Sequence, residues 1–283
     1  MKKSNLIILI IVCVVGYLII FSIIFNRFRT TLPTSNAIGL IEVEGPIIDS
    51  KDIVRQIKSY SKNPFIKGIL IRIESPGGGV SASQEIYSEI KSAKSKGKKV
   101  VVSMGSIAAS GGYYIACPAD IIVANPGTIT GSIGVIMEFP IFTELMKKLG
   151  IKFEIIKSRE HKDIGSPFRE MTDKERKLLN ETTADVYNQF IDVIVENRKI
   201  PKEKVLEIAD GRIFSGKQAQ SLGLVDSIGT YEDAKRIIAN LCGIKKEPKI
   251  LKERPKFSLI RKLLSRSFNW LFSPIPLYLY TTD

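Results

Sequence analysis

Two glycine-rich turns, each directly after an apolar strand and directly before a helix, restrict the fold of this chain more than any other feature. The first strand, residues 68–73, is stopped by the Ser-Pro-Gly-Gly-Gly run at residues 75–79. The second strand, residues 99–104, leads into a Gly/Ser/Ala-rich turn in which Ser110 begins the next helix. Strands that alternate with helices in this way predict crossover connections and a largely parallel sheet.

The alternation continues on both sides of these turns. Apolar runs predict further strands at residues 38–43, 120–124 and 152–156. A long helical pattern extends from Thr172, a good N-cap residue, to about residue 198. We find no internal repeat, so residues 38–243 are predicted to form one domain.

The N-terminal apolar segment does not belong to that domain. Residues 6–25 contain no charged side chain, and about 20 apolar residues are enough to cross a bilayer as a helix. A cleavable signal peptide has a shorter apolar region and a small-residue site close behind it, where this chain has Arg27 and Arg29. We therefore expect an uncleaved anchor, with a short tail (residues 1–5) before it and a linker (residues 26–37) after it. Two lysines precede the span, and this weak bias predicts an extracytoplasmic body.

Much of the formal charge of +13 lies in residues 91–99 and, within the tail (residues 244–283), in residues 245–266. A basic protein can bind nucleic acid, but the chain has no basic-aromatic recognition motif, so we expect no nucleic-acid partner. Residues 257–272 can form a basic helix with an aromatic and apolar face. Such a helix suits a membrane surface with anionic lipid, and it also suits packing on a neighbouring subunit; both interpretations remain open.

Cysteine and metal-ligand patterns add no further site. Three cysteines do not make a disulfide framework, and Cys117 and Cys242 lie in apolar surroundings that suggest packing. No metal-ligand spacing occurs, so we expect neither a metal nor a cofactor.

Ser110 is the candidate nucleophile. A serine hydroxyl needs a base within hydrogen-bond reach, and the only histidine of the chain is His161. The base is therefore His161 or a lysine, of which the neighbouring Lys162 is the candidate. A lysine acts as a base only when it is neutral, and desolvation favours the neutral amine. The site should then be apolar where Lys162 arrives, with a small hydroxyl such as that of Ser132 to orient the amine.

Acyl transfer also requires donors for the developing oxyanion. The glycines after the first strand leave backbone N–H groups unobstructed by side chains, and Gly111 offers another N–H group directly after Ser110. Each glycine cluster alone is more often a simple turn. Together, in the same strand-turn-helix setting, they indicate an oxyanion site built from Gly77, Gly78 and Gly111.

At these residues the chain resembles the signal peptide peptidase (protease IV) family in its short single-anchor bacterial form. The resemblance covers most of residues 38–240 in order. The segments that carry it are residues 74–79, 106–114, 127–135, 161–167 with 169–171, and 211–216.

The resemblance implies an α/β fold: a Clp protease/crotonase-like spiral of mostly parallel strands with outer helices, preceded by one transmembrane helix. It implies a Ser/Lys dyad in which Ser110 is the nucleophile, Lys162 is the general base and Ser132 holds the lysine. The oxyanion donors that match the family are Gly77 and Gly111, with Gly78 as a close alternative.

The resemblance also implies partners, substrates and a location. Family members form dome-like rings on the membrane, in which the serine and the lysine of one site come from neighbouring subunits. The implied activity is that of a membrane-anchored serine endopeptidase that degrades residual signal peptides and other apolar polypeptides. The implied location is the bacterial cell membrane, with a single span.

Three other functions remain open at this point. A related Ser/Lys peptidase would cleave an intact membrane-protein partner instead of leftover signal peptides. A crotonase-type enzyme would share the fold and the glycine turn but would need a pocket for coenzyme A. A non-enzymatic membrane scaffold would tolerate the loss of Ser110 and Lys162.

The last apolar segment, residues 274–280, suggests a further hypothesis. It could be extended, so it resembles what an apolar peptidase groove would accept. We expect it to reach a neighbouring active site and occupy it.

Overall fold

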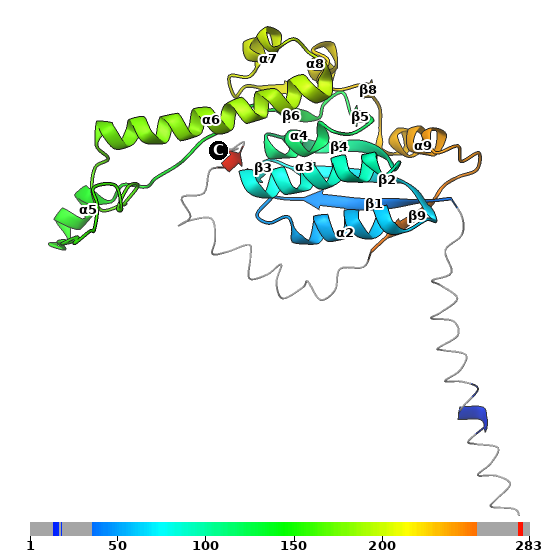
Figure 1. Cartoon of the computed structure of the whole chain (residues 1–283), viewed down its shortest axis with the longest axis horizontal. Coiled ribbons are helices and arrows are strands. Elements are labelled where there is room, and N and C mark those ends of the chain that lie inside the picture. Colours follow the sequence, from blue (N-terminus) through cyan, green and yellow to red (C-terminus); the bar gives the residue numbers. More distant parts are fainter. Residues whose placement is uncertain (1–13, 17, 19–35, 254–276, 280–283) are drawn as a thin grey trace, which may run out of the picture.

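The computed structural model describes residues 14–16, 18, 36–253 and 277–279 (Figure 1). In chain order the elements of the folded body and of the last segment are β1 (Ala37–Glu44), α2 (Lys51–Lys62), β2 (Ile66–Ser75), β3 (Gly77–Gly79), α3 (Val80–Ser95), β4 (Lys99–Ala109), α4 (Gly111–Ala116), β5 (Ile121–Ala124), β6 (Ile129–Gly131), α5 (Thr143–Lys148), α6 (Asp173–Arg198), α7 (Lys202–Ile208), β7 (Ile213–Ser215), α8 (Gly216–Ser221), β8 (Ser227–Ile228), α9 (Tyr231–Leu241), β9 (Lys249–Lys252) and β10 (Leu277–Leu279).

The main sheet is mostly parallel. Its strand order is β7-β6-β4-β2-β1-β9, and β5 pairs with both β4 and β8 beside this path. Only the pair of β6 and β7 is antiparallel among the described neighbours of this sheet. The predicted α/β fold with a largely parallel sheet is confirmed.

Both faces of the sheet are covered. Side chains of successive residues in a strand point to opposite faces, and β2 shows this clearly: Ile69 and Ile71 pack into the larger core cluster, whereas Leu70 packs into the smaller one. The larger cluster includes apolar side chains of α2, α3, α4 and α6, and the smaller one includes Ile238 of α9. Figure 1 shows α9 apart from the helices α2, α3 and α4. The carboxyl ends of β4 and β6 therefore rest on a well-packed body.

The predicted strands at residues 38–43, 68–73, 99–104 and 120–124 coincide with β1, β2, β4 and β5 to within a few residues at either end. The strand predicted at residues 152–156 was wrong, because these residues have no regular structure and their side chains are exposed. Ile156 is 96% exposed. An apolar run without a neighbouring strand to pair with cannot form a sheet, whatever its strand propensity.

The sheet also extends beyond residue 243, where the domain was predicted to end. Strand β9 pairs in parallel with β1, from Ala37 opposite Lys249 to Leu40 opposite Lys252. The hydroxyl of Tyr60 donates to the Leu251 carbonyl at 3.1 Å, which ties β9 to α2. The first part of the predicted tail is therefore the edge of the sheet.

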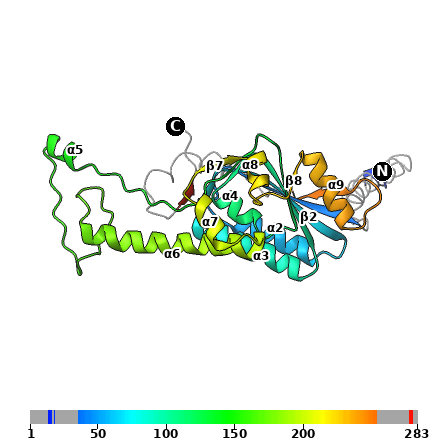
Figure 2. The same ribbon diagram turned by 90° about the horizontal axis from the view of Figure 1, so that it is seen from above.

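One part of the chain projects away from this body, and we call residues 137–178 the arm. It contains α5, the connection from α5 to α6, and the first turns of α6, and both views show α5 at its outer end (Figures 1 and 2). Helix α6 begins with the predicted cap at Thr172, whose hydroxyl accepts from the Glu175 N–H in a capping box. Its buried apolar residues all lie in its C-terminal half, from Phe190 to Ile194. The other half carries the arm outward.

The predicted anchor at residues 6–25 lies outside the described residues except for positions 14–16 and 18. Among the residues that are described, no helix is both long enough and apolar enough to cross a membrane. The predicted amphipathic helix at residues 257–272 also lies outside them.

The end of the chain forms a separate two-stranded pair. Strand β10 is antiparallel to β3, with Leu277 opposite Gly79, Tyr278 opposite Gly78 and Leu279 opposite Gly77. The segment expected to reach a neighbouring site thus pairs with the glycine-rich turn of its own chain.

Candidate active site

Ser110 lies in a sharp turn between the buried strand β4 and the short helix α4. Its backbone has a φ of 52° and a ψ of −119°, a conformation that non-glycine residues rarely adopt. The turn is held on both sides, since the Ser110 N–H donates to the Gly131 carbonyl at 2.8 Å and the Ser110 carbonyl accepts from Tyr114 at 2.8 Å. Strained residues of this kind cluster at functional sites.

The Ser110 side chain is buried and has no partner. The residue is 1% exposed, and its Oγ makes no hydrogen bond to any other described residue. A buried hydroxyl without a partner costs free energy and requires an explanation. A group supplied by another molecule would give this hydroxyl its hydrogen-bond partner.

Ser132 occupies the matching position on the next strand. Ala109 is paired with Gly131, so Ser110 and Ser132 follow directly after paired residues at the carboxyl ends of β4 and β6. Ser132 also has a positive φ, 48°, and is 7% exposed. Its N–H donates to the Arg212 carbonyl at 2.8 Å. The structure therefore brings the two predicted serines together at one edge of the sheet.

The predicted oxyanion glycines lie at the same edge. Gly77 and Gly78 have φ values of 108° and 153°, which favour glycine. The Gly77 N–H donates to Ser75 Oγ at 3.2 Å and is therefore engaged. Backbone hydrogen bonds from Ile47 to Gly77 and from Gly79 to Ile47 turn the amide of Gly78 to the opposite side of β3.

Gly78 and Gly111 approach each other closely. A Cβ added at Gly111 would lie 3.2 Å from the Gly78 nitrogen and 2.6 Å from Ser83 Oγ. Ser75 and Ser83 were not predicted from the sequence; Ser75 Oγ accepts from the Gly77 N–H, and Ser83 Oγ donates to the Gly79 carbonyl at 3.0 Å. Gly111 follows Ser110 directly and the Gly78 nitrogen lies beside it, so the amides of Gly78 and Gly111 are the oxyanion candidates.

A matched pair of substitutions tests this backbone geometry. Gly78→Ala should lower the free energy of unfolding by about 1–3 kcal/mol, because the alanine would keep a strained φ. Its Cβ would also overlap the Ile47 backbone oxygen and lie 2.6 Å from the Ile47 nitrogen. Gly79→Ala should change it by less than about 1 kcal/mol, since its φ of −60° suits alanine. Urea unfolding curves measure both, and equal losses would contradict the geometry.

Lys162 and His161 are not brought to this edge. Both lie in the connection between α5 and α6, in the arm, which both views show apart from α4 (Figures 1 and 2). The Lys162 side chain is exposed and has no hydrogen-bond or ion-pair partner among the described residues. His161 Nε2 lies 3.7 Å from Glu160, and its Nδ1 has no partner there either. Within one chain, neither candidate base meets Ser110.

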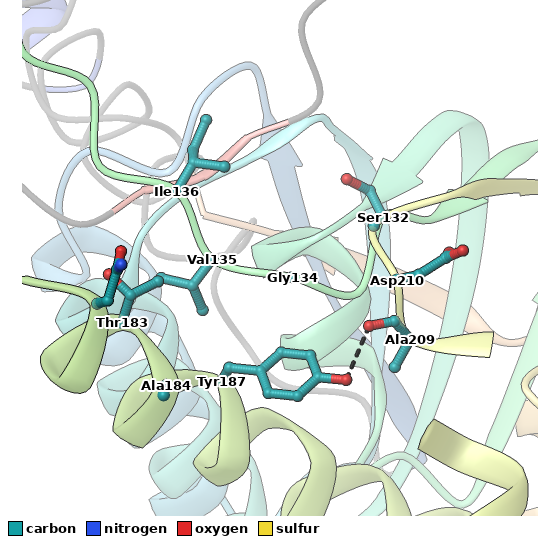
Figure 3. A pocket seen from close by; sticks show the side chains of 11 residues that line it. Ser132, Gly134, Val135, Ile136, Thr183, Ala184, Tyr187, Ala209 and Asp210 are labelled. Atoms are coloured by element: carbon teal, nitrogen blue, oxygen red, sulfur yellow. Dashed lines mark hydrogen bonds between the residues drawn. The ribbon is translucent and has the colours of Figure 1, made fainter. Parts of the chain in front are cut away.

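An open hollow lies beside Ser132 (Figure 3). Its volume is about 470 Å³, and its walls come from the loop after β6, from α6 and from the loop before β7. Tyr187 of α6 forms one wall, and its hydroxyl donates to the Ala209 carbonyl at 2.9 Å. Val135 and Ile136 form an apolar side. A side chain from outside the chain could reach Ser132 through this hollow.

Comparison with known proteins places these residues in a family context. Residues 92–245 match Peptidase family S49, and residues 39–126 match the Clp protease family. The slr0021 protein of Synechocystis sp. is 45% identical over 219 residues, which are 77% of this chain and 78% of that protein.

Two further relatives are longer. Protease 4 of Salmonella typhi is 34% identical over 226 residues, which cover 77% of this chain and 36% of that protein. Serine protease SPPA, chloroplastic, of Arabidopsis thaliana is 35% identical over 225 residues, 78% of this chain and 33% of that protein. The chain thus spans about a third of the length of these two relatives. Among solved structures, a point mutant of ClpP1 from Listeria monocytogenes matches 69% of this chain and 93% of its own, with 18% identity and a TM-score of 0.47.

Proposed function

Because the chain belongs to Peptidase family S49 and is a serine peptidase, we propose that Ser110 is its nucleophile and that Lys162 of a second copy is its general base. Ser132 orients the lysine amine, and the N–H groups of Gly78 and Gly111 stabilise the oxyanion. The observation that carries the proposal is the buried Ser110 hydroxyl, which lacks a partner among the described residues and sits on a strained backbone.

The arm supports the choice of a second copy as the source of the lysine. It carries Lys162 outward and exposes a row of apolar side chains: Ile141, Leu145, Leu149, Ile151, Phe153, Ile155 and Ile156. Exposed apolar patches of this kind mark surfaces that bind another protein. A neighbouring copy that covers the arm would bury this surface, and the hollow beside Ser132 offers the way in for the lysine.

The proposed reaction begins at Lys162. The neutral amine of Lys162 takes the proton from Ser110 Oγ, and the oxygen attacks the carbonyl carbon of the scissile peptide bond. The N–H groups of Gly78 and Gly111 donate to the oxyanion. The lysine returns its proton to the leaving amine as the C–N bond breaks. Water, deprotonated by the same lysine, then hydrolyses the acyl-enzyme and frees Ser110.

Strand β3 supplies the place for the substrate backbone. An extended peptide can add to a free strand edge through main-chain hydrogen bonds. The chain's own β10 pairs with β3 in this manner, antiparallel and opposite Gly78. We infer that substrates lie along the same edge, where the amide of Gly78 faces them.

The substrate class follows from the expected location. An anchor at residues 6–25 would hold the peptidase at the bacterial cell membrane with its body outside the cytoplasm, next to residual signal peptides and other apolar polypeptides. An acyl-CoA activity is disfavoured by the match to a peptidase family over residues 92–245. Cleavage of an intact membrane-protein partner remains the second candidate, because it requires the same site.

Full-length protein in liposomes can decide between these substrates. We expect a free synthetic signal peptide to be cut within its apolar region, whereas the intact preprotein and a folded membrane protein stay whole; mass spectrometry identifies the fragments. Ser110→Ala in the same liposomes is the control for contaminating proteases. Cleavage of the membrane protein with the signal peptide left intact would favour the second candidate.

A further inference from the structure

The Arg169 guanidinium joins two parts of the arm that lie six residues away on either side. Its Nε and Nη2 donate to the two carboxylate oxygens of Asp163 at 2.8 and 2.9 Å, and Nη2 also donates to the Asp163 carbonyl at 3.2 Å. Towards the helix, Nη1 and Nη2 donate to the two carboxylate oxygens of Glu175 at 2.8 and 2.5 Å. We call these three residues the arginine clasp.

The clasp is mostly hidden from solvent. Glu175 is 2% exposed and is the only charged residue among the buried ones that the structure describes. The side chains of Asp163 and Arg169 are 12% and 25% exposed. A buried carboxylate is stable only when it is paired and hydrogen-bonded, and breaking such a pair costs far more than breaking an exposed one.

The charges of the clasp persist at neutral pH. The hydrogen bonds from Arg169 lower the pKa of Glu175 to about 2, and those from Arg169 and from Lys157 hold the pKa of Asp163 well below its usual range. The hydrogen bonds to the two carboxylates also raise the pKa of Arg169 further. Both carboxyl pKa values are lower in the folded protein than in the unfolded chain. The clasp therefore stabilises the fold at any pH above the unfolded-state pKa values, and this stabilisation is lost as the pH falls towards 2. It is therefore fully ionised wherever a neutral lysine could act as a base.

Lys162 stands directly before one end of the clasp. Its own side chain has no partner among the described residues, so its placement depends on the backbone that carries it. Arg169 holds both the side chain and the carbonyl of Asp163, and Glu175 is fixed in the first turn of α6 by its capping box with Thr172. The clasp thus joins Asp163, the residue after Lys162, to the first turn of a long helix.

Other contacts of the arm do not depend on the clasp. The Phe142 N–H donates to the Pro167 carbonyl at 2.7 Å, and the rings of Phe153 and Phe168 stack with centroids 3.9 Å apart. These contacts should keep the arm folded when Arg169 is replaced. The effect of losing the clasp is then local to the segment that contains Lys162.

We propose that Arg169 is a positioning residue, which through Asp163 and Glu175 fixes the backbone of Lys162 in the arrangement that is presented to Ser110 of a neighbouring copy. The inference rests on the proposed function of Lys162. Arg169 itself touches no reacting atom. A lysine at this position could not replace it, because one ammonium cannot form parallel pairs of hydrogen bonds with two carboxylates.

The test compares Arg169→Met with Lys174→Met in the full-length protein. Lys174 pairs with Glu160 at 2.9 Å on the same arm, but both side chains are largely exposed, so its loss should cost little. For Arg169→Met we expect kcat on an apolar peptide to fall about 10- to 100-fold, with KM within about twofold, because the base is displaced while peptide binding is unchanged. Lys174→Met should keep kcat within about twofold of the original.

Two conservative variants sharpen the test. The kcat of Arg169→Lys should be as low as that of Arg169→Met. Glu175→Gln should reduce kcat in part. In the double variant with Arg169→Met it should cause little further loss, since both substitutions act on one contact. Hydrogen exchange should accelerate at residues 159–166 in Arg169→Met and remain unchanged in β4 and α4. If Arg169→Met fails to assemble, as sedimentation would show, Glu175→Gln carries the test alone.

Equal kcat values for Arg169→Met and Lys174→Met would overturn the inference, and so would full activity of Arg169→Lys. Lys162→Ala, assayed alongside, separates this result from a failure of the proposed function. If Lys162→Ala is inactive and Arg169→Met is fully active, the positioning role of Arg169 is rejected and the proposed function of Lys162 stands. If Lys162→Ala is active, Lys162 is not the base, and the positioning role of Arg169 is rejected together with it.

Discussion

Ser110→Ala and Lys162→Ala should each lower kcat/KM on an apolar peptide by at least about 10³-fold, because the nucleophile and its base act as one unit. The buried Ser110 hydroxyl has no other partner among the described residues that could take its proton. His161→Ala should stay within about threefold of normal activity, although His161 is the neighbour of Lys162 in the chain. A fluorogenic peptide assay with the full-length protein measures all three.

The control for this prediction is that each variant remains folded and assembled, as measured by melting and sedimentation. Lys162 is exposed in the arm, so Lys162→Ala should melt and sediment as the original protein does. Ser110→Ala removes a hydroxyl that satisfies no other described group and leaves the backbone of the turn as it is. Its free energy of unfolding should therefore not decrease. An inactive His161→Ala beside an active Lys162→Ala would make histidine the base and reject the proposed dyad.

Removing residues 257–283 should raise kcat/KM on short peptides by about tenfold, since a tethered segment competes at an effective concentration in the millimolar range. Strand β10 pairs with β3 opposite Gly78, where a substrate backbone is proposed to lie. The gain should appear mainly in KM, because the tail occupies the binding edge and leaves the reacting groups unchanged.

A single substitution can separate this effect from other roles of the tail. Tyr278→Pro removes one N–H group from β10 and should raise activity in the full-length chain, whereas Thr281→Pro lies beyond the strand and should not. If the tail instead serves only to dock on lipid, truncation should abolish liposome binding and leave peptide hydrolysis as it was. Unchanged activity in both the truncated chain and Tyr278→Pro would reject occupation of the site.

The sequence was sufficient to predict the strands that form the centre of the sheet. β2 and β4 are buried on both faces, so they read as continuous apolar runs that end in turn residues. The same signal failed at residues 152–156, where the apolar side chains lie on the exposed arm. Strand β9 was missed because it is a short edge strand, Lys-Ile-Leu-Lys, in a basic stretch.

The candidate site was predictable only in part. Ser110, Ser132 and the glycines follow strands whose carboxyl ends meet at one edge, and this is a consequence of the parallel topology. The engagement of the Gly77 amide by Ser75 could not be read from the sequence, because it depends on one local turn. The separation of Lys162 from Ser110 within one chain was implied only by the family resemblance, because the residue pattern does not give the direction in which α6 leaves the body.

The most direct measurement mixes two inactive variants, Ser110→Ala and Lys162→Ala, after dissociation and reassembly. If each site combines Ser110 of one copy with Lys162 of another, random mixing should restore about a quarter of the original activity, because half of the serines and half of the lysines are intact. The original protein, carried through the same reassembly, sets the full scale. A mixture as inactive as each variant alone, beside a recovered original protein, would contradict a site shared between copies.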